Sequence, residues 1–156
     1  MTESGFHHGN PAELPLTQDV RQLIADARQE SIRLDHEYIG TEHLVLALSH
    51  QADATGTFPA LAIDPERVDA TLSGIIERGQ ISLDPSLERP FTSRTKHAFA
   101  LAAETAHELG HADVGVPHVL VGLLRERLNI GAQVLADQGL TAERAYEYAR
   151  GSGPTG

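Results

Sequence analysis

The stretch HELGH, residues 107–111, holds the residue types that could most directly do chemistry. It matches H-E-x-x-H, in which two histidines one helical turn apart hold zinc and the glutamate activates a water molecule. Such a site would make the protein a zinc-dependent metallopeptidase. A third protein ligand is also needed, and the elongated pattern asks for glycine at 114 and histidine at 117. The sequence has Val114 and Pro117 there.

The element that would carry these histidines also argues against zinc. Leu109 is the last residue of an apolar helical period, and Gly110 stands where a helix-ending glycine belongs. If the helix stops there, His107 and His111 do not lie on adjacent turns of one helix and cannot share a metal ion. We therefore expect no metal site, no cofactor and no catalytic residue, with the metallopeptidase as an alternative.

Composition excludes several other classes of function. The chain has 156 residues, a formal net charge of −10 and no cysteine. An acidic chain does not favour binding to nucleic acid, which depends on clustered Lys and Arg. No apolar run approaches the roughly 20 residues that span a bilayer, and no basic or apolar leader opens the chain. We expect a cytoplasmic protein that binds neither nucleic acid nor membrane.

The chain matches itself at an offset of 75 positions. LTQDVRQLIADARQESIRLDHEYIGTEHLVLAL (16–48) aligns without a gap to FTSRTKHAFALAAETAHELGHADVGVPHVLVGL (91–123). Thr17 aligns with Thr92, and apolar residues recur at helical spacing in both copies. Two copies of one helical unit are the economical interpretation.

The repeat predicts an all-α fold of two pseudo-symmetric four-helix repeats, eight helices in all. Thr17 and Thr92 are the expected N-caps of the first helix of each copy, and Thr41 is the expected cap of the second helix of the first copy. Shorter helices are expected at 55–61, 65–78, 130–138 and 142–150. We divide the chain into a disordered tail (1–14), repeat 1 (15–78), a linker (79–90), repeat 2 (91–150) and a flexible tail (151–156).

Two histidines recur in both copies. His36 aligns with His111, and His43 with His118. An imidazole beside a helix start can bond loop backbone through one nitrogen and stay neutral, so we expect a structural role. A metal ion held by such a pair is the alternative.

One stretch of the first copy, RLDHEY followed by IGTEHLVLAL, matches LGHADVGVPHVLVGLLRE in the second copy. Together they resemble the Clp N-terminal (Clp repeat) domain at the front of ClpA- and ClpC-type unfoldases. The resemblance covers about residues 15 to 150. It implies a non-catalytic platform that binds degradation substrates, adaptors or Clp protease components. Since the sequence has no Walker motif, we expect a stand-alone module that is not an enzyme.

Some ClpC-type modules read phosphoarginine, a degradation mark. In that pattern each copy supplies Thr-x-Arg at its first helix and Glu in GTEH. The first copy keeps Thr17 and Glu42 but has Asp19 in place of the arginine. Taken copy by copy, each half-site lacks a different part, with the Glu42 half-site the better candidate. The residues carried over as possible phosphoarginine or peptide ligands are Thr17, Thr41, Glu42, Thr92 and Arg94.

The second copy differs at other positions of the pattern. It keeps Thr92 and Arg94 but has Val116 and Pro117 where Thr and Glu are expected. Two alternatives stay open. Glu42 could serve only to offset the dipole of its helix, and a groove between the repeats could sequester a small molecule or cyclic peptide.

Overall fold

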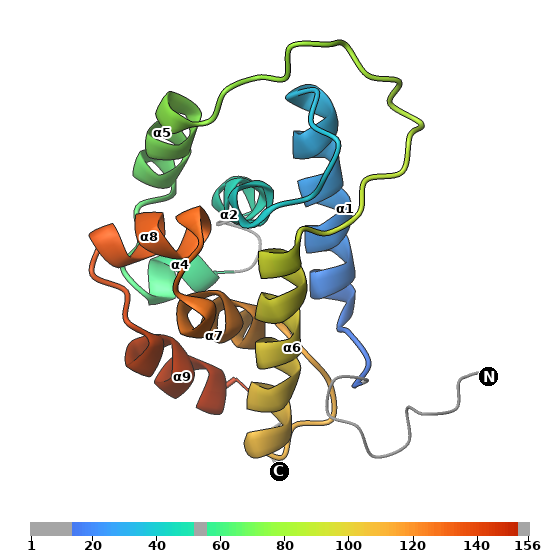
Figure 1. Cartoon of the computed structure of the whole chain (residues 1–156). Helices are drawn as coiled ribbons and strands as arrows, with labels where there is room; N and C mark the ends of the chain where they lie inside the picture. The colour runs from blue at the N-terminus through green and yellow to red at the C-terminus, as the bar shows by residue number, and fades with distance from the viewer. Residues whose placement is uncertain (1–13, 52–55, 153–156) are drawn as a thin grey trace, which may run out of the picture.

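The computed structural model describes residues 14–51 and 56–152, and eight α-helices form within them (Figure 1). The predicted all-α fold is confirmed. The expected tails lie almost wholly outside the described residues. No helix in the described part of the chain is long and apolar enough to cross a membrane. The helices are α1 (Gln18–Arg33), α2 (Thr41–His50), α4 (Thr57–Ala60), α5 (Pro65–Ile75), α6 (Ser93–Glu108), α7 (Val116–Glu126), α8 (Ile130–Asp137) and α9 (Ala142–Arg150).

The first helices of the two repeats begin as predicted. The Thr17 hydroxyl accepts the Val20 amide hydrogen at 3.2 Å, and the Thr92 hydroxyl accepts that of Thr95 at 3.1 Å. Both threonines have extended backbones, as N-cap residues do. The two caps confirm the offset of 75 at the level of single hydrogen bonds.

The predicted cap of α2 is wrong by one residue. Gly40 is the N-cap and Thr41 is the first helical residue. The N-cap amide of Gly40 donates to Nδ1 of His43 at 2.8 Å, which leaves the Thr41 hydroxyl free for another partner. That hydroxyl accepts the amide hydrogen of Gly131, at 3.3 Å, from the other repeat.

One helix is shorter than its pattern predicts. The expected helix 65–78 ends at Ile75, because Ile76 has an extended backbone. The chain then turns so that the carbonyl of Glu77 accepts a hydrogen bond from Nε2 of His36 at 2.8 Å. The helix therefore ends before residue 78, and the residues that follow it make a tertiary contact instead.

The two apolar helices α2 and α7 form the centre of the core. Nearly every side chain of each is buried, and α1 packs on α2 while α6 packs on α7. The repeats also share packing, because α8 of the second repeat contacts α2 and α5 of the first. One continuous core therefore joins both repeats.

Two short parallel bridges connect the repeats reciprocally. The segment before α1 bridges to the segment before α7 at Leu16 and Val114, and the segment before α2 bridges to that before α6 at Ile39 and Phe91. In the second bridge, the Ile39 amide donates to the Pro90 carbonyl at 2.8 Å. Each bridge places the first turn of a helix of one repeat beside the first turn of a helix of the other.

The segment between α5 and α6 crosses one end of the molecule as an arc (Figure 1). The buried residue Arg89, which is only 5% exposed, anchors this segment. Its guanidinium donates to the carbonyls of His36, at 3.1 Å, and Leu87, at 2.7 Å. Arg28 of α1 also donates to the carbonyls of Pro85, at 3.2 Å, and Leu87, at 3.3 Å, so the segment predicted as a linker is attached to the first repeat.

Candidate ligand-binding site

The HELGH stretch does not present two histidines on one helix. Helix α6 ends at Glu108, and Gly110 has a left-handed φ of +72°. Glu108 forms an ion pair with Arg125 at 3.0 Å. Nδ1 of His111 bonds to His118 at 2.8 Å. The predicted helix end is confirmed, so His107 and His111 do not lie on adjacent turns of one helix, as the zinc pattern requires.

The recurring histidines form a hydrogen-bonded pair in each repeat. In the first repeat, Nδ1 of His43 accepts the Gly40 amide hydrogen at 2.8 Å, so a neutral ring carries its proton on Nε2. That nitrogen lies 2.8 Å from Nδ1 of His36, whose own Nε2 donates to the Glu77 carbonyl. Burial, followed by the charges of His36 and Arg33, lowers the pKa of His43 to about 3.

The second repeat reproduces this arrangement. Nδ1 of His118 accepts the Gly115 amide hydrogen at 2.8 Å, and its Nε2 lies 2.8 Å from Nδ1 of His111. Burial is the main cause that lowers the pKa of His118 to about 4. The predicted structural role of these histidines is therefore confirmed. They fix the first turns of α2 and α7.

Four of the five candidate ligand residues line one pocket, here called the Glu42 pocket. It has a volume of about 460 Å³. Residues of the first repeat supply one side and residues of the second repeat supply the rest. Its lining comprises Thr41, Glu42, Thr92, Ser93, Arg94, Leu128, Asn129 and Ile130.

Three helix N-termini meet at the Glu42 pocket. Thr41 and Glu42 open α2, Ser93 and Arg94 open α6, and Ile130 opens α8. The first amides of a helix lack intrahelical acceptors and carry the positive end of the helix dipole. This convergence, with three hydroxyl groups and an arginine nearby, is chemically suited to an anion such as a phosphate.

The approach of α8 depends on a glycine. A Cβ at Gly131 would lie 2.7 Å from Cγ2 of Val45 and 2.9 Å from the Thr41 carbonyl oxygen. Any larger residue would push α8 away from α2 and open that side of the pocket.

The Glu42 carboxylate is the only acidic group among the residues that line this pocket. It folds back over Gly40, where a Cβ would collide with it. The Tyr38 hydroxyl is hydrogen-bonded to it. The pKa of Tyr38 is raised first by burial and then by the charge of Glu42 and this hydrogen bond. Tyr38 therefore helps to orient Glu42, whose carboxylate can receive a cationic group such as a guanidinium.

The Arg94 guanidinium forms an ion pair with a buried carboxylate. Its Nη1 lies 3.2 Å from Oε2 of Glu126, whose side chain is 6% exposed, whereas that of Arg94 is 52% exposed. The other oxygen of Glu126 accepts from Asn129 Nδ2 at 2.8 Å. The guanidinium is thus oriented by one partner while half of its surface faces solvent.

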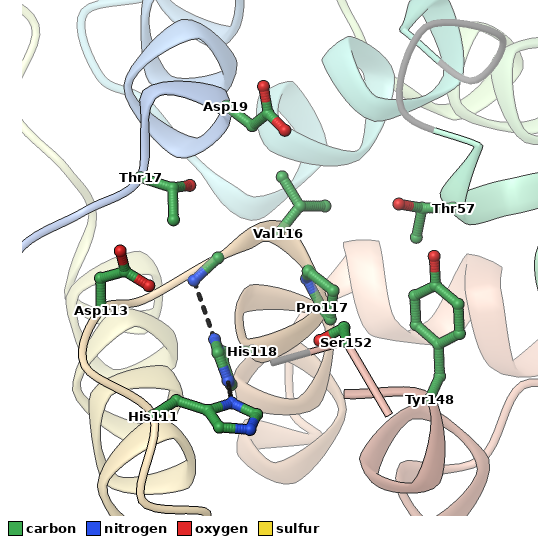
Figure 2. A pocket seen from close by; sticks show the side chains of 11 residues that line it. Thr17, Asp19, Thr57, His111, Asp113, Val116, Pro117, His118, Tyr148 and Ser152 are labelled. Atoms are coloured by element: carbon green, nitrogen blue, oxygen red, sulfur yellow. Dashed lines mark hydrogen bonds between the residues drawn. The ribbon is translucent and has the colours of Figure 1, made fainter. Parts of the chain in front are cut away.

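The fifth candidate residue, Thr17, lies in a second pocket, here called the Asp19 pocket (Figure 2). This pocket has a volume of about 250 Å³ and also lies between the repeats. Figure 2 shows Thr17, the N-cap of α1, and Asp19 in the first turn of α1 on the side of the pocket opposite Val116 and Pro117 of α7. Its lining comprises Thr17, Asp19, Thr57, His111, Asp113, Gly115, Val116, Pro117, His118, Tyr148 and Ser152.

The sequence pattern groups the candidate residues by repeat, Thr17 with Glu42 and Thr92 with Arg94. This grouping is wrong. The reciprocal bridges place Glu42 with Thr92 and Arg94, and place Thr17 and Asp19 with Pro117. The Glu42 pocket retains every residue type of the phosphoarginine pattern, whereas the Asp19 pocket lacks both its arginine and its glutamate. Sequence reasoning missed this because the pairing depends on contacts between segments that are far apart in the chain, such as Leu16 with Val114 and Ile39 with Phe91.

A third cavity is an apolar groove between α1 and α6, with a volume of about 370 Å³. Phe91 and Phe99 stack across it with ring centroids 5.2 Å apart. The groove lies between helices of the two repeats. Its lining comprises Leu14, Leu16, Ile24, Phe91, Lys96, Phe99, Ala100, Ala103 and Val114.

The fold agrees with the comparisons with known proteins. The model of the Clp repeat (R) N-terminal domain matches residues 15–138. The chain belongs to this family. A Bacillus subtilis relative, "Negative regulator of genetic competence ClpC/MecB", is 33% identical over 133 residues. The match covers 84% of this chain and 16% of that protein.

Other relatives and solved structures give the same result. The "Chaperone protein ClpB" of Oceanobacillus iheyensis is 30% identical over 133 residues, again covering 84% of this chain and 16% of the relative. The Hsp104 N-terminal domain of Candida albicans has a TM-score of 0.67 at 13% identity and covers 86% of this chain and 89% of that one. The ClpD N-terminal domain of Arabidopsis thaliana has a TM-score of 0.63 at 21% identity and covers 88% and 95%. These structural neighbours share the fold.

Proposed function

We propose that the chain is a non-catalytic binding module that engages degradation substrates or adaptors, and that the Glu42 pocket takes a phosphorylated arginine side chain. The observation that carries this proposal is the convergence of Glu42 and Arg94 with three helix N-termini in one pocket. The family is an N-terminal domain, and the match covers 16% of a longer Clp protein in the relatives. A separate domain at the front of such a protein supports a role in recognition.

The chemistry of phosphoarginine fits the two ends of this pocket. Its guanidinium group is complementary to the Glu42 carboxylate. Its phosphate is complementary to Arg94, to the hydroxyls of Thr41 and Thr92, and to the first amides of α6. Neither free arginine nor inorganic phosphate satisfies both ends. The pocket should therefore prefer the modified residue over either component.

Calorimetric titration with phosphoarginine, arginine and inorganic phosphate tests this proposal. We expect saturable binding of phosphoarginine alone, one molecule per chain. The variant Glu42→Gln keeps the shape of the side chain but removes its charge, and it should abolish binding. Asp19→Asn is the matched control in the other pocket and should bind as wild type does. Equal binding of phosphate and phosphoarginine, or no binding of either, would contradict the proposal.

The apolar groove supports a second candidate function, the binding of an apolar peptide or cyclic peptide. Its aromatic and aliphatic lining offers surface for burial rather than charge. A fluorescent apolar peptide should bind to wild type and bind much more weakly to Phe99→Ser, while phosphoarginine binding stays unchanged. If both variants bind it equally, the groove is not the site.

A further inference from the structure

The Glu42 pocket has an apolar side that phosphoarginine alone would not use. Its polar side comes from α2 and α6, whereas Leu128 and Ile130 lie on the side formed by the turn into α8. Leu128 is 73% exposed, the largest fraction among the exposed large hydrophobic side chains in the described part of the chain. A leucine this exposed at the edge of a charged pocket offers apolar surface to whatever occupies that pocket.

Hydrogen bonds define the turn that carries Leu128. Arg127 has a φ of +67°, a left-handed conformation that residues with a side chain rarely adopt. The amide of Leu128 donates to the backbone carbonyl of Glu126 at 2.8 Å and to its Oε1 at 3.1 Å. Asn129 donates to the Leu123 carbonyl at 3.0 Å. These bonds position the backbone of Leu128, whose side chain is exposed.

A single carboxylate links this turn to the cationic group of the pocket. Oε1 of Glu126 accepts from the turn, while Oε2 binds Nη1 of Arg94 at 3.2 Å. The guanidinium that would meet a phosphate and the exposed leucine are therefore fixed relative to each other. Successive residues of an extended peptide advance about 3.3 Å. Because Arg94 and Leu128 line the same pocket, the residues that flank a phosphoarginine bound there would pass near Leu128.

We propose that Leu128 contacts the residue that flanks the phosphoarginine of a bound peptide, so that the chain selects phosphoarginine beside an apolar side chain. This inference rests on the proposed function of the Glu42 pocket and names its substrate class more narrowly. Partial burial at an open rim corresponds to a preference of roughly 3–10-fold.

Two phosphoarginine peptides that differ only in their flanking residues test the inference. One carries leucine on both sides of the phosphoarginine and the other carries serine. We expect wild type to bind the leucine peptide about 3–10-fold more tightly in a fluorescence anisotropy titration. Leu128→Ser should bind the two peptides with equal affinity. Ile81→Ser, at a side chain that is 72% exposed in the linker, is the control and should keep the preference.

The outcomes separate the two proposals. If free phosphoarginine binds but wild type shows no preference, or if Leu128→Ser keeps the preference, the inference is wrong and the proposed function stands. If free phosphoarginine and both peptides fail to bind, both proposals are wrong. A preference for the serine peptide would likewise overturn the inference.

Discussion

The Glu42 pocket and the Asp19 pocket occupy equivalent positions in the fold, with the roles of the two repeats exchanged. Both lie where a helix start of one repeat meets a helix start of the other. In the Glu42 pocket the helix starts carry Thr41, Glu42 and Arg94. The positions offset by 75 in the Asp19 pocket carry Val116, Pro117 and Asp19.

The difference between the pockets is chemical rather than architectural. Asp19 places a negative charge where Arg94 is positive. Pro117 has neither the carboxylate of Glu42 nor an amide hydrogen. Val116 lacks the hydroxyl of Thr41. All three differences fall in the Asp19 pocket, so the proposed anion site is confined to the Glu42 pocket and its counterpart is unsuited to a phosphate.

Reversing the charge of the intact pocket should have the largest effect. Arg94→Asp copies the Asp19 pocket and replaces attraction of a phosphate by repulsion. We expect phosphoarginine affinity to fall by at least about 100-fold, since one charge-assisted hydrogen bond contributes about 1.5–3 kcal/mol and repulsion adds to its loss. Calorimetry measures the change, and circular dichroism checks that the fold survives. Arg67→Asp, on an exposed side chain of α5, is a suitable charge control. A loss of less than tenfold in Arg94→Asp would show that this guanidinium does not meet the phosphate.

Rebuilding the other pocket is the converse experiment. The triple variant Asp19→Arg, Val116→Thr and Pro117→Glu gives the Asp19 pocket the residues of its counterpart. We expect the calorimetric stoichiometry to rise from one phosphoarginine per chain to two, with the new site weaker than the original by roughly tenfold because no counterpart of Glu126 holds the new arginine. An unchanged stoichiometry in a folded triple variant would mean that the compared residues do not define the site.

The two histidine pairs predict a moderate effect of acid on stability. The pKa values of His43 and His118 in the folded chain, about 3 and about 4, lie below the ordinary value of 6.5. Between pH 6.5 and about 4 the unfolded chain therefore binds more protons than the folded chain. The free energy of unfolding should be constant above pH 6.5 and fall as pH decreases, by up to about 1.4 kcal/mol per pH unit for each histidine.

Urea unfolding between pH 7.5 and 4.5 measures this slope. His43→Asn and His118→Asn should each flatten it, because asparagine can accept the same backbone hydrogen bond without titrating. If the slope is the same in wild type and both variants, these histidines do not govern the acid response.

The smallest expected effect separates capping from ligand binding. Thr17→Ala and Thr92→Ala each remove an N-cap hydrogen bond, so both should lower the free energy of unfolding by about 1 kcal/mol. Only Thr92→Ala should also weaken phosphoarginine binding, by a few-fold, because only Thr92 lines the Glu42 pocket. Equal effects of the two variants on binding would contradict the assignment of the pockets.

Local features of the fold could be predicted from the sequence because they depend on neighbouring residues. The caps at Thr17 and Thr92 and the helix end at Gly110 follow from hydroxyl, glycine and apolar spacing within one helix. The same logic failed at Thr41. There a histidine three residues after Gly40 takes the capping role, and the Thr41 hydroxyl bonds to the other repeat.

Features that depend on long-range contacts could not be predicted from the pattern. Helical periodicity contains no information on which helix starts lie together, so the pockets were paired incorrectly. The buried position of Arg89 was also missed, since an arginine between a glutamate and a proline in a polar stretch usually lies in solvent. Only its bonds to four backbone carbonyls make burial possible.

The reciprocal bridges have a consequence for how the molecule is assembled. At Leu16–Val114 and Ile39–Phe91 each half of the chain completes its partner, as the subunits of a two-fold dimer do when they are joined into one polypeptide. Neither half forms a whole binding pocket alone. Two fragments divided within 79–90 should therefore reassociate when mixed and recover both pockets, whereas either fragment by itself should recover neither.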